Sequence, residues 1–361
     1  MKDAPTITGV RARAVNVPLE YPVRTSVGVV ATSPLVLIDI ETDSAAVGRA
    51  YIFTYTPMAL KATQVLTESI GQSLVGAAVA PIDIYETLSG RLRLLGRTGL
   101  ATMVCAGIDM ALWDALGQHN DIPLVTLLGG APKSIPAYDS HSMDGVEIGV
   151  HRAARARDNG YRAIKTKIGY PSLADDLEIV RAIRGAVGAQ VEIFVDYNQS
   201  LSVPEACRRI DALASEGIGW VEEPTLQEDL HGHSTIRNRS RIPIQLGENW
   251  CEPTDMQRAL AAGASDLAMV DAMKIGGVTG WLRAASHAQT AGMPLSSHIF
   301  QEVSVHLLAV TPTAHWLERM DLAGPILSSP TQFVDGRAQC PEEPGIGIAW
   351  NEDAVAKYSV K

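Results

Sequence analysis

The chain has 361 residues, of which 46% are hydrophobic and 19% charged, and its formal net charge is -10. These proportions are typical of a globular protein, and the length suits one barrel-sized domain with a smaller partner domain. The negative charge argues against nucleic acid or an anionic membrane as the main partner, although the local charge of a pocket can oppose the net charge.

The segment MKDAPTITGV at the start lacks the apolar stretch of a signal peptide, and no uninterrupted apolar run appears long enough to span a bilayer. The cysteines are scattered and form no CxxC pair: Cys105, Cys207, Cys251 and Cys340. We therefore expect reduced thiols in a cytoplasmic protein without a membrane partner.

The first part of the chain mixes strand and helix patterns. Three segments have strand character: TITGVRARAVNVPL, PLVLIDIET and VGRAYIFTYT. Between the first two, YPVRTSVGVVATSP contains Gly, Pro and Ser and is expected to interrupt the strand pattern. From Pro57 to about Gly117 the apolar spacing becomes helical, which predicts an α+β domain over residues 1–130.

After Pro132, short β-rich segments alternate with amphipathic helices. Glycines 188, 217 and 292 are expected to end three of these helices, and SVHLLAV is a candidate for the last one. The eight β-rich segments are IPAYDS, AIKTKI, VEIFVD, IGWVEE, IPIQLGE, DLAMVD, PLSSH and AHWLE.

This alternation predicts a parallel β/α barrel over residues 131–324. The alternative, an open doubly wound sheet, is disfavoured because no glycine-rich phosphate-binding loop follows an early strand. The tail, residues 325–361, leaves the alternating pattern and is expected to return to the first domain.

A polar residue with catalytic or ligand chemistry falls at or near the C-terminal end of each strand candidate. In β/α barrels this rim carries the active site, and although one such residue often only caps a helix, eight in phase predict a site. The residues are spaced 20 to 29 positions apart: Ser140, Lys167, Asp196, Glu222, Glu248, Asp271, His298 and Glu318.

Three carboxylates on adjacent strands, Asp196, Glu222 and Glu248, would repel one another unless they are protonated or bind a cation. Hard oxygen ligands without a thiolate suit Mg²⁺ or Mn²⁺. Because Glu222 and Glu223 are neighbours, only one of them can face inward, and strand phase does not decide which.

Lys165 and Lys167 must point to the same side of their strand because side chains alternate. A neighbouring cation and the metal are expected to depress the pKa of Lys167 and make it a general base. On the other side Asp271 would orient His298. Glu318 could donate a proton if its pKa is raised, and Lys274, just past the sixth strand, is a rival base.

Other residues carry weaker signals. His231 and His233 in HGH read better as a solvated loop than as a metal site, and His306 and His315 as packed or loop residues. The glycine-rich run at Gly276 reads as an ordinary βα loop or an anion-binding turn.

In this order, these residues resemble the mandelate racemase subgroup of the enolase superfamily over essentially the whole chain. The segments that carry the resemblance are VNVPLEYPV, GIDMALWDALG, AYDSHS, KTKIGYP, VDYNQSL, VEEPTLQ, GENW, DAMKIGGVTGW, SSHIFQE and TPTAHWLERMDLAG. The resemblance implies a (β/α)7β barrel with an N-terminal α+β capping domain that the tail completes.

The resemblance also implies roles for individual residues. Asp196, Glu222 and Glu248 would bind Mg²⁺, which selects Glu222 over Glu223. Lys167 would take the α-proton from the S enantiomer of a 2-hydroxy acid, and His298 with Asp271 from the R enantiomer. The remaining contacts would be to the substrate carboxylate for Lys165, Glu318 and Ser140, and to the region of the α-hydroxyl for Asn198.

In such proteins the first domain lends a flap over the barrel mouth, here expected at residues 20–33. Apolar side chains would line it and the neighbouring surface: Val23, Val27, Val30, Tyr55, Leu94, Ile299 and Met320. Arg24, where the resemblance leads us to expect histidine, would face solvent or contact a polar ring substituent.

An apolar lid favours an aryl 2-hydroxy acid, mandelate or a close analogue, racemised through an ene-diolate. The alternatives are a sugar-acid dehydratase of the same superfamily and a non-catalytic barrel that binds an acid. The resemblance further implies a symmetric homo-oligomer, an octamer.

Overall fold

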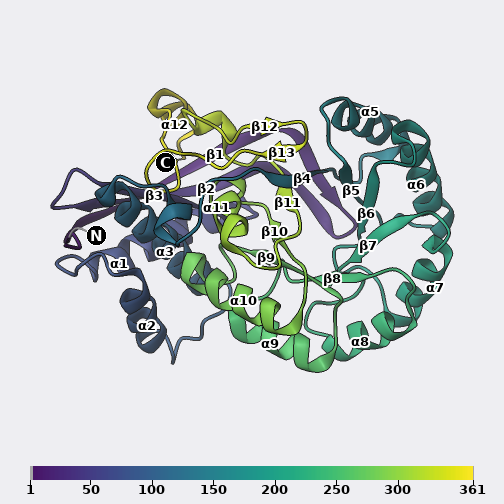
Figure 1. The fold of residues 1–361 in the computed structure, drawn as a ribbon, viewed down its shortest axis with the longest axis horizontal. Coiled ribbons are helices and arrows are strands. Elements are labelled where there is room, and N and C mark those ends of the chain that lie inside the picture. The colour runs from purple at the N-terminus through teal and green to yellow at the C-terminus, as the bar shows by residue number, and fades with distance from the viewer. Residues whose placement is uncertain (1–2, 361) are drawn as a thin grey trace.

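The computed structural model describes residues 3–360 and places a curled barrel beside a smaller sheet-and-helix domain (Figure 1). In this capping domain, an antiparallel sheet of order β1–β2–β3 packs against helices. The strands are β1 (Ile7–Thr25), β2 (Gly28–Thr42) and β3 (Val47–Phe53). The helices are α1 (Leu60–Gln72), α2 (Pro81–Arg91), α3 (Leu100–Asn120) and α4 (Leu124–Leu127), with a 3-10 turn at Pro57–Ala59.

Helix α3 is the core helix of the capping domain. By length and composition it could also cross a membrane, but 83% of its most apolar window is buried inside the protein. It packs closely on β3, where Gly48 has no room for a side chain because a Cβ would collide with the backbone of Ala111.

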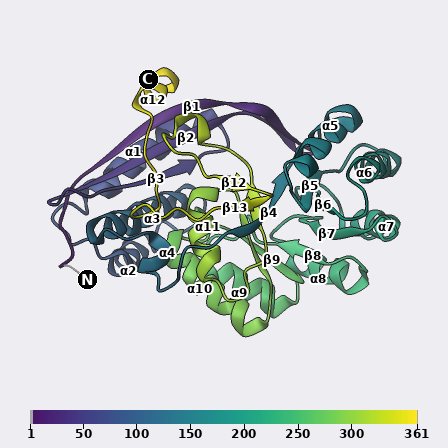
Figure 2. The same ribbon diagram turned by 45° about the horizontal axis from the view of Figure 1, so that its top comes forward.

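The first two strands run further than the sequence predicted. The expected interruption at 21–34 is wrong, because β1 continues to Thr25 and β2 begins at Gly28, with a two-residue turn between them. Pro22 is tolerated because β1 is an edge strand and its register shifts between Pro18 and Val23. The residues that signal a break are thus concentrated at the tip of a long hairpin, which arches over the barrel toward α5 and β5 (Figure 2).

Eight parallel strands form the barrel, and within residues 3–360 seven helices connect them, as (β/α)7β predicts. The strand order is β10–β9–β8–β7–β6–β5–β4, with β11 paired to β4. A β-bridge between Leu295 of β10 and Ala314, just before β11, links the two ends of this order. The strands are β4 (Ile135–Ser140), β5 (Ala163–Lys167), β6 (Glu192–Asp196), β7 (Ile218–Glu222), β8 (Ile244–Leu246), β9 (Leu267–Asp271), β10 (Leu295–His298) and β11 (Leu317–Arg319). The helices are α5 (Gly145–Asp158), α6 (Leu173–Val187), α7 (Val203–Leu213), α8 (Leu230–Arg239), α9 (Pro253–Ala262), α10 (Gly277–Ala291) and α11 (Gln301–Val310).

Two of the three predicted helix ends at glycine are confirmed. Gly188 and Gly292 follow directly after α6 and α10. Helix α7 ends before Gly217, which lies in the turn leading into β7 with a φ of 69°. The glycine-rich turn at Gly276 is occupied by a side chain of the protein, because Asp109 of α3 accepts hydrogen bonds of 2.9 and 2.6 Å from the backbone N–H and hydroxyl of Thr279.

Aromatic and apolar side chains fill the barrel one layer below its rim. Most of these residues lie two positions before a strand-end residue, so they point inward on the same side of their strand. This cluster consists of Tyr138, Ala163, Phe194, Trp220 and Met269. The rim residues therefore lie directly above a packed, mainly apolar layer.

The tail contacts both parts of the molecule. It comprises a 3-10 turn at Gly324–Ile326, β12 (Phe333–Val334), β13 (Arg337–Ala338), which pairs with β4, and α12 (Glu352–Tyr358). The Trp350 indole N–H donates to Asp39 over 2.8 Å, and Glu352 forms an ion pair with Arg13. The tail therefore contacts the capping domain, while the division into residues 1–130, 131–324 and 325–361 stays a prediction.

Candidate active site

The predicted strand-end residues converge at one mouth of the barrel. Most are the last residue of their strand, Glu318 lies within β11, and Glu248 follows β8 by two positions. None is more than 8% exposed. Strand pairing, ion pairs and the carboxylate cluster bring the following residues together: Ser140, Lys165, Lys167, Asp196, Glu222, Glu248, Asp271, His298 and Glu318.

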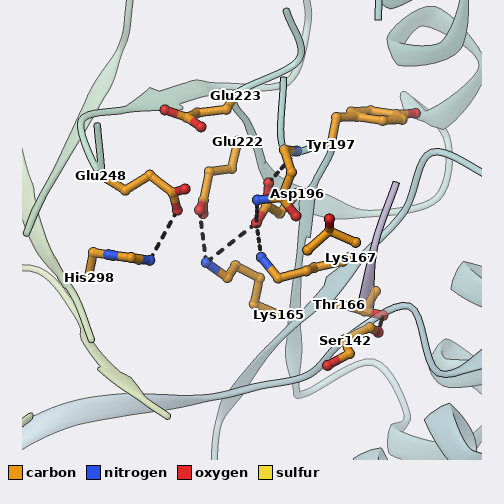
Figure 3. Close-up of polar contacts among 12 residues, drawn as sticks. Ser142, Lys165, Thr166, Lys167, Asp196, Tyr197, Glu222, Glu223, Glu248 and His298 are labelled. Atoms are coloured by element: carbon orange, nitrogen blue, oxygen red, sulfur yellow. Dashed lines mark hydrogen bonds and ion pairs between the residues drawn. The ribbon is translucent and has the colours of Figure 1, made fainter. Parts of the chain in front are cut away.

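The acidic triad of Asp196, Glu222 and Glu248 can hold a metal ion. One carboxylate oxygen from each residue lies within 4.8 Å of the other two (Figure 3). Burial raises the pKa of Glu222 well above its usual value, Lys165 opposes this, and the neighbouring carboxylates add to it. A divalent cation relieves that repulsion, and an all-oxygen donor set suits Mg²⁺.

The backbone conformation decides which of Glu222 and Glu223 faces the acidic triad. Glu223 has a φ of 38°, in the left-handed region, and its two carboxylate oxygens each accept from the side-chain amide of Asn249 at 2.9 Å. Glu222 instead points to Lys165 (Figure 3). Asn249, in the segment GENW, was not singled out from the sequence, although its place beside Glu248 was a usable signal.

Lys165 is fully buried and compensated. Its ammonium lies 2.8 Å from Glu222 Oε1 and 2.8 Å from Glu318 Oε1. The ammonium of Lys167 lies 2.5 Å from Asp196 Oδ2. The cations that looked anomalous on an apolar strand are therefore neutralised by carboxylates from three other strands.

The expected depression of the Lys167 pKa is not what the structure shows. Burial is the largest influence and lowers this pKa, and Lys165 lowers it further, but Asp196, Glu248 and Glu222 together raise it above its usual value. The prediction rested on Lys165 and a bound metal, and it did not include the ion pair with Asp196. Because Asp196 belongs to the triad, a cation sharing that carboxylate opposes the upward shift.

His298 and Asp271 form the predicted pair. They occupy matching positions on β10 and β9, and Nδ1 of His298 lies 2.7 Å from Asp271 Oδ2. This contact places the proton on Nδ1 and leaves Nε2, 3.2 Å from Glu248, to face the site. Burial lowers the pKa of His298, but Glu248 and Asp271 outweigh burial and raise it.

Glu318 is an ionised acceptor in this structure. Burial acts to raise its pKa, but Lys165 and His298 hold it at about 2. Its Oε2 accepts the backbone N–H of Ile299 at 2.9 Å. The condition under which the sequence made Glu318 a proton donor, a raised pKa, is therefore not met here.

Asn198 and Ser140 each present an oxygen for which no hydrogen-bond partner exists within residues 3–360. The backbone and side-chain N–H groups of Asn198 donate to Asp196 at 2.7 and 3.0 Å, while its Oδ1 is buried and unpartnered. The hydroxyl of Ser140 is also buried without a partner. Buried polar atoms of this kind are available to a ligand.

The hairpin tip is fastened to the barrel rim. The carbonyl of Arg24 accepts from Met143 N at 2.9 Å, and the hydroxyl of Ser26 donates to the carbonyl of Tyr197 at 2.9 Å. The Arg24 side chain itself is exposed. Figure 2 shows the hairpin reaching the barrel, and the role of residues 20–33 as a substrate flap stays a prediction.

Val23 and Met320 line a cavity of about 60 Å³ together with Ser140, and the same cavity is also lined by charged side chains such as Arg152 and Arg319. Val30 pairs with Val23 across the hairpin. Ile299 is buried next to His298 and has a φ of 36°.

Val27 and Leu94 are not brought to the site, contrary to expectation. Val27 is 69% exposed because it occupies the two-residue turn of the hairpin. Leu94 is fully exposed between α2 and α3.

Lys274 does not occupy a base position. Its ammonium donates to Asn249 Oδ1 at 2.5 Å and lies 4.6 Å from the centre of the Tyr55 ring. The Tyr55 hydroxyl is buried without a hydrogen-bond partner in the described chain. The side of the site opposite Lys167 is occupied by His298 instead.

Two further histidines have structural contacts. His233 is fully buried in α8, with Nδ1 3.0 Å from the Asp229 carbonyl, so the expected solvated loop is wrong there. His306 is packed between α4 and the tail, with Nε2 3.1 Å from the Ile346 carbonyl.

Comparison with known proteins agrees with this geometry. The profile of the mandelate racemase / muconate lactonizing enzyme N-terminal domain matches residues 7–129, and that of the enolase C-terminal domain-like family matches residues 149–354. A crystal structure of an enolase from Bradyrhizobium, complexed with magnesium and mandelic acid, is 48% identical with a TM-score of 0.96 over 100% of both chains.

Two curated relatives differ in their named reactions. The 3,6-anhydro-alpha-L-galactonate cycloisomerase of Streptomyces coelicolor is 31% identical, over 90% of this chain and 91% of the relative. The L-talarate/galactarate dehydratase of Salmonella typhimurium is 30% identical, over 80% and 73%. The chain thus belongs to the mandelate racemase / muconate lactonizing enzyme family of the enolase superfamily, as an enzyme that uses Mg²⁺ for enolisation-type chemistry.

Proposed function

We propose that this enzyme is a racemase that interconverts the enantiomers of an aryl 2-hydroxy acid, mandelate or a close analogue, by 1,1-proton transfer through an ene-diolate. The observation that carries the proposal is a pair of candidate bases at opposite ends of the carboxylate cluster. Lys167 is anchored by Asp196 at 2.5 Å and His298 by Asp271 at 2.7 Å (Figure 3).

Removing a proton next to a carboxylate creates a dianion, so the site has to stabilise charge on the two carboxylate oxygens. Bound to Asp196, Glu222 and Glu248, Mg²⁺ supplies Lewis-acid stabilisation of that charge. Lys165 provides a buried ammonium for the same carboxylate. Glu318 meets its other oxygen and has to take up a proton to do so, because its pKa of about 2 leaves it ionised in this structure.

The two bases act from opposite faces of the substrate carbon. Lys167 removes the proton from the S enantiomer, and His298, oriented by Asp271, returns one on the other face. The reverse reaction exchanges these roles. Asn198 Oδ1 and the Ser140 hydroxyl, both buried and unpartnered in the described chain, contribute polar contacts to the hydroxyl and carboxylate.

An apolar lining favours an aryl substrate over a polyol. Val23 and Met320, which lie together at one cavity, would contribute to it with Ile299 and the ring of Tyr55, whose centre lies 4.6 Å from that of the tilted Phe53 ring. The mandelic acid in the Bradyrhizobium structure supports this substrate class.

The alternative is a sugar-acid dehydratase, which shares the first deprotonation and then loses a β-hydroxyl. The named activity of the Salmonella relative favours it. A non-catalytic acid-binding barrel is disfavoured by the complete set of bases and metal ligands.

Polarimetry separates these functions. With Mg²⁺, optically pure mandelate should lose its rotation without any change in composition, and a chelator should prevent the loss. If no aryl 2-hydroxy acid racemises while an aldonate yields a keto acid, the enzyme is a dehydratase. Binding of the acid without α-proton exchange in D₂O would indicate a binding protein.

We also propose that the enzyme is cytoplasmic and forms a symmetric homo-oligomer, an octamer. Light scattering on the purified protein measures its mass directly, and a monomer would contradict the proposal.

A further inference from the structure

Lys274 follows the sixth barrel strand in a fixed backbone turn. Its backbone N–H donates to Asp271 Oδ1 at 3.1 Å, and its carbonyl accepts from Glu252 N at 3.2 Å. The backbone of Lys274 is therefore fixed by two hydrogen bonds, and its ammonium lies between the barrel and Tyr55 of the capping domain.

The ammonium of Lys274 fixes the orientation of the Asn249 side chain. An asparagine amide has an accepting oxygen on one side and two N–H donors on the other. With Lys274 donating to Oδ1 at 2.5 Å, the amide N–H groups must point the other way. There they donate to both oxygens of Glu223 at 2.9 Å and reach Glu248 Oε1 at 3.4 Å.

The orientation of Asn249 affects two carboxylates, Glu223 outside the acidic triad and Glu248 within it. Asn249 holds Glu223 apart from the acidic triad and at the same time contacts Glu248, a member of it. If the amide turned over, its oxygen would face both carboxylates, and the donors that hold them would be lost.

We propose that Lys274 is a positioning residue for the metal site, acting through Asn249 on Glu223 and Glu248. The ring of Tyr55 seats the ammonium at 4.6 Å, so docking of the capping domain contributes to metal affinity. The inference rests on the proposed function in one respect, the assignment of Asp196, Glu222 and Glu248 as the ligands.

Calorimetric titration of the full-length protein with Mg²⁺ alone, without substrate, tests this role. Lys274→Met should weaken Mg²⁺ binding about 10- to 100-fold, the usual effect of removing a residue that orients a ligand. Lys274→Arg keeps a cation over the ring and a donor to Asn249, so it should restore most of the affinity. Wild-type affinity in Lys274→Met would overturn the proposal.

Arg283→Met is the matched control. The Arg283 guanidinium also lies 4.6 Å from a tyrosine ring, that of Tyr85, but it pairs with Glu86 instead of contacting the triad through another residue. Its loss should leave Mg²⁺ affinity within about twofold of wild type. An equal loss in both variants would mean that removing any such cation loosens the protein, which would contradict a specific role for Lys274.

Two further variants test the path. Asn249→Ala combined with Lys274→Met should bind Mg²⁺ no more weakly than Asn249→Ala alone, because both changes break the same chain of contacts. Tyr55→Leu should weaken binding about two- to tenfold, whereas Tyr55→Phe keeps the ring and should not. Additive losses would overturn the path through Asn249.

Failure of this inference can be told apart from failure of the proposed function. If Glu248→Gln abolishes Mg²⁺ binding while Lys274→Met does not, only the positioning role is wrong. If Glu248→Gln has no effect, the ligand assignment itself is wrong. If Lys274→Met retains Mg²⁺ affinity but stops α-proton exchange from one enantiomer, Lys274 is a base.

Discussion

The two sides of the active site hold their bases by different means. On the lysine side, Lys167 has one ion pair among the described residues, with Asp196. On the histidine side, the imidazole of His298 lies between Glu248 at 3.2 Å and Asp271 at 2.7 Å. Burial lowers the pKa of both bases, and the carboxylates raise both above their usual values.

The difference lies in which carboxylates the metal shares. Asp196 and Glu248 both belong to the acidic triad, but Asp271 does not. A cation in the triad therefore competes with Lys167 for Asp196, its one ion-pair partner among the described residues. It does not compete with His298 for Asp271. This makes lysine basicity dependent on the metal, and histidine basicity more dependent on the protein.

The largest expected effect comes from removing one base at a time. Lys167→Arg and His298→Asn should each abolish racemisation, because every turnover needs both bases, with a loss of about 10²- to 10⁴-fold or more. His298→Asn should still exchange the α-proton of the S enantiomer, and Lys167→Arg that of the R enantiomer, measured by NMR in D₂O. Equal loss of exchange from both enantiomers in both variants would break the two-sided comparison.

Glu318 lies between the two sides, 2.8 Å from Lys165 and 3.9 Å from His298. Its pKa of about 2 should rise when a substrate carboxylate takes Lys165 away from it, so binding should take up about one proton near neutral pH. Calorimetry with racemic mandelate in buffers of different ionisation enthalpy measures that proton.

Glu318→Gln should abolish this uptake and lower turnover about 10²- to 10³-fold, the usual cost of losing one stabilising contact to developing charge. The same loss of turnover without any proton uptake by the wild type would mean that Glu318 serves as an anion that holds Lys165.

A pH profile measures the histidine side by itself. In Lys167→Arg, exchange from the R enantiomer requires neutral His298 and should therefore rise with pH through the His298 pKa. Because Asp271, which is not part of the triad, raises that pKa, the rise should lie above about 6.5, the value for an exposed histidine. Adding Asp271→Asn removes one negative partner and should move the rise down by about one pH unit. If Asp271→Asn does not change the pH at which exchange rises, Asp271 only orients the imidazole ring.

The strand-end residues were predictable because the barrel repeats. Each βα unit returns the chain to the same rim, so Asp196 and His298 could be placed there from spacing alone. Strand phase could not separate Glu222 from Glu223, since the choice depends on a left-handed φ of 38° at Glu223 and on Asn249.

The ionisation of the site was less predictable than its position. The pKa of Lys167 is raised and that of Glu318 is lowered, because each depends on an ion pair with a residue from a different strand. The hairpin was missed for a local reason. Pro22 and Gly28 signal a break, and only strand pairing across the sheet shows that they lie in and beside its tip.

The smallest expected effect concerns the cover of the site. Ser26→Ala removes the 2.9 Å hydrogen bond to the Tyr197 carbonyl, which is worth about 1 kcal/mol, so KM should rise about fivefold or less. A flap that covers both bases should raise KM equally for the two enantiomers. Val27→Ala, one position further along and 69% exposed, is the control and should leave KM unchanged. A rise for one enantiomer only would show that the flap belongs to one side of the site, and an effect of Val27→Ala would show that the tip contacts the substrate after all.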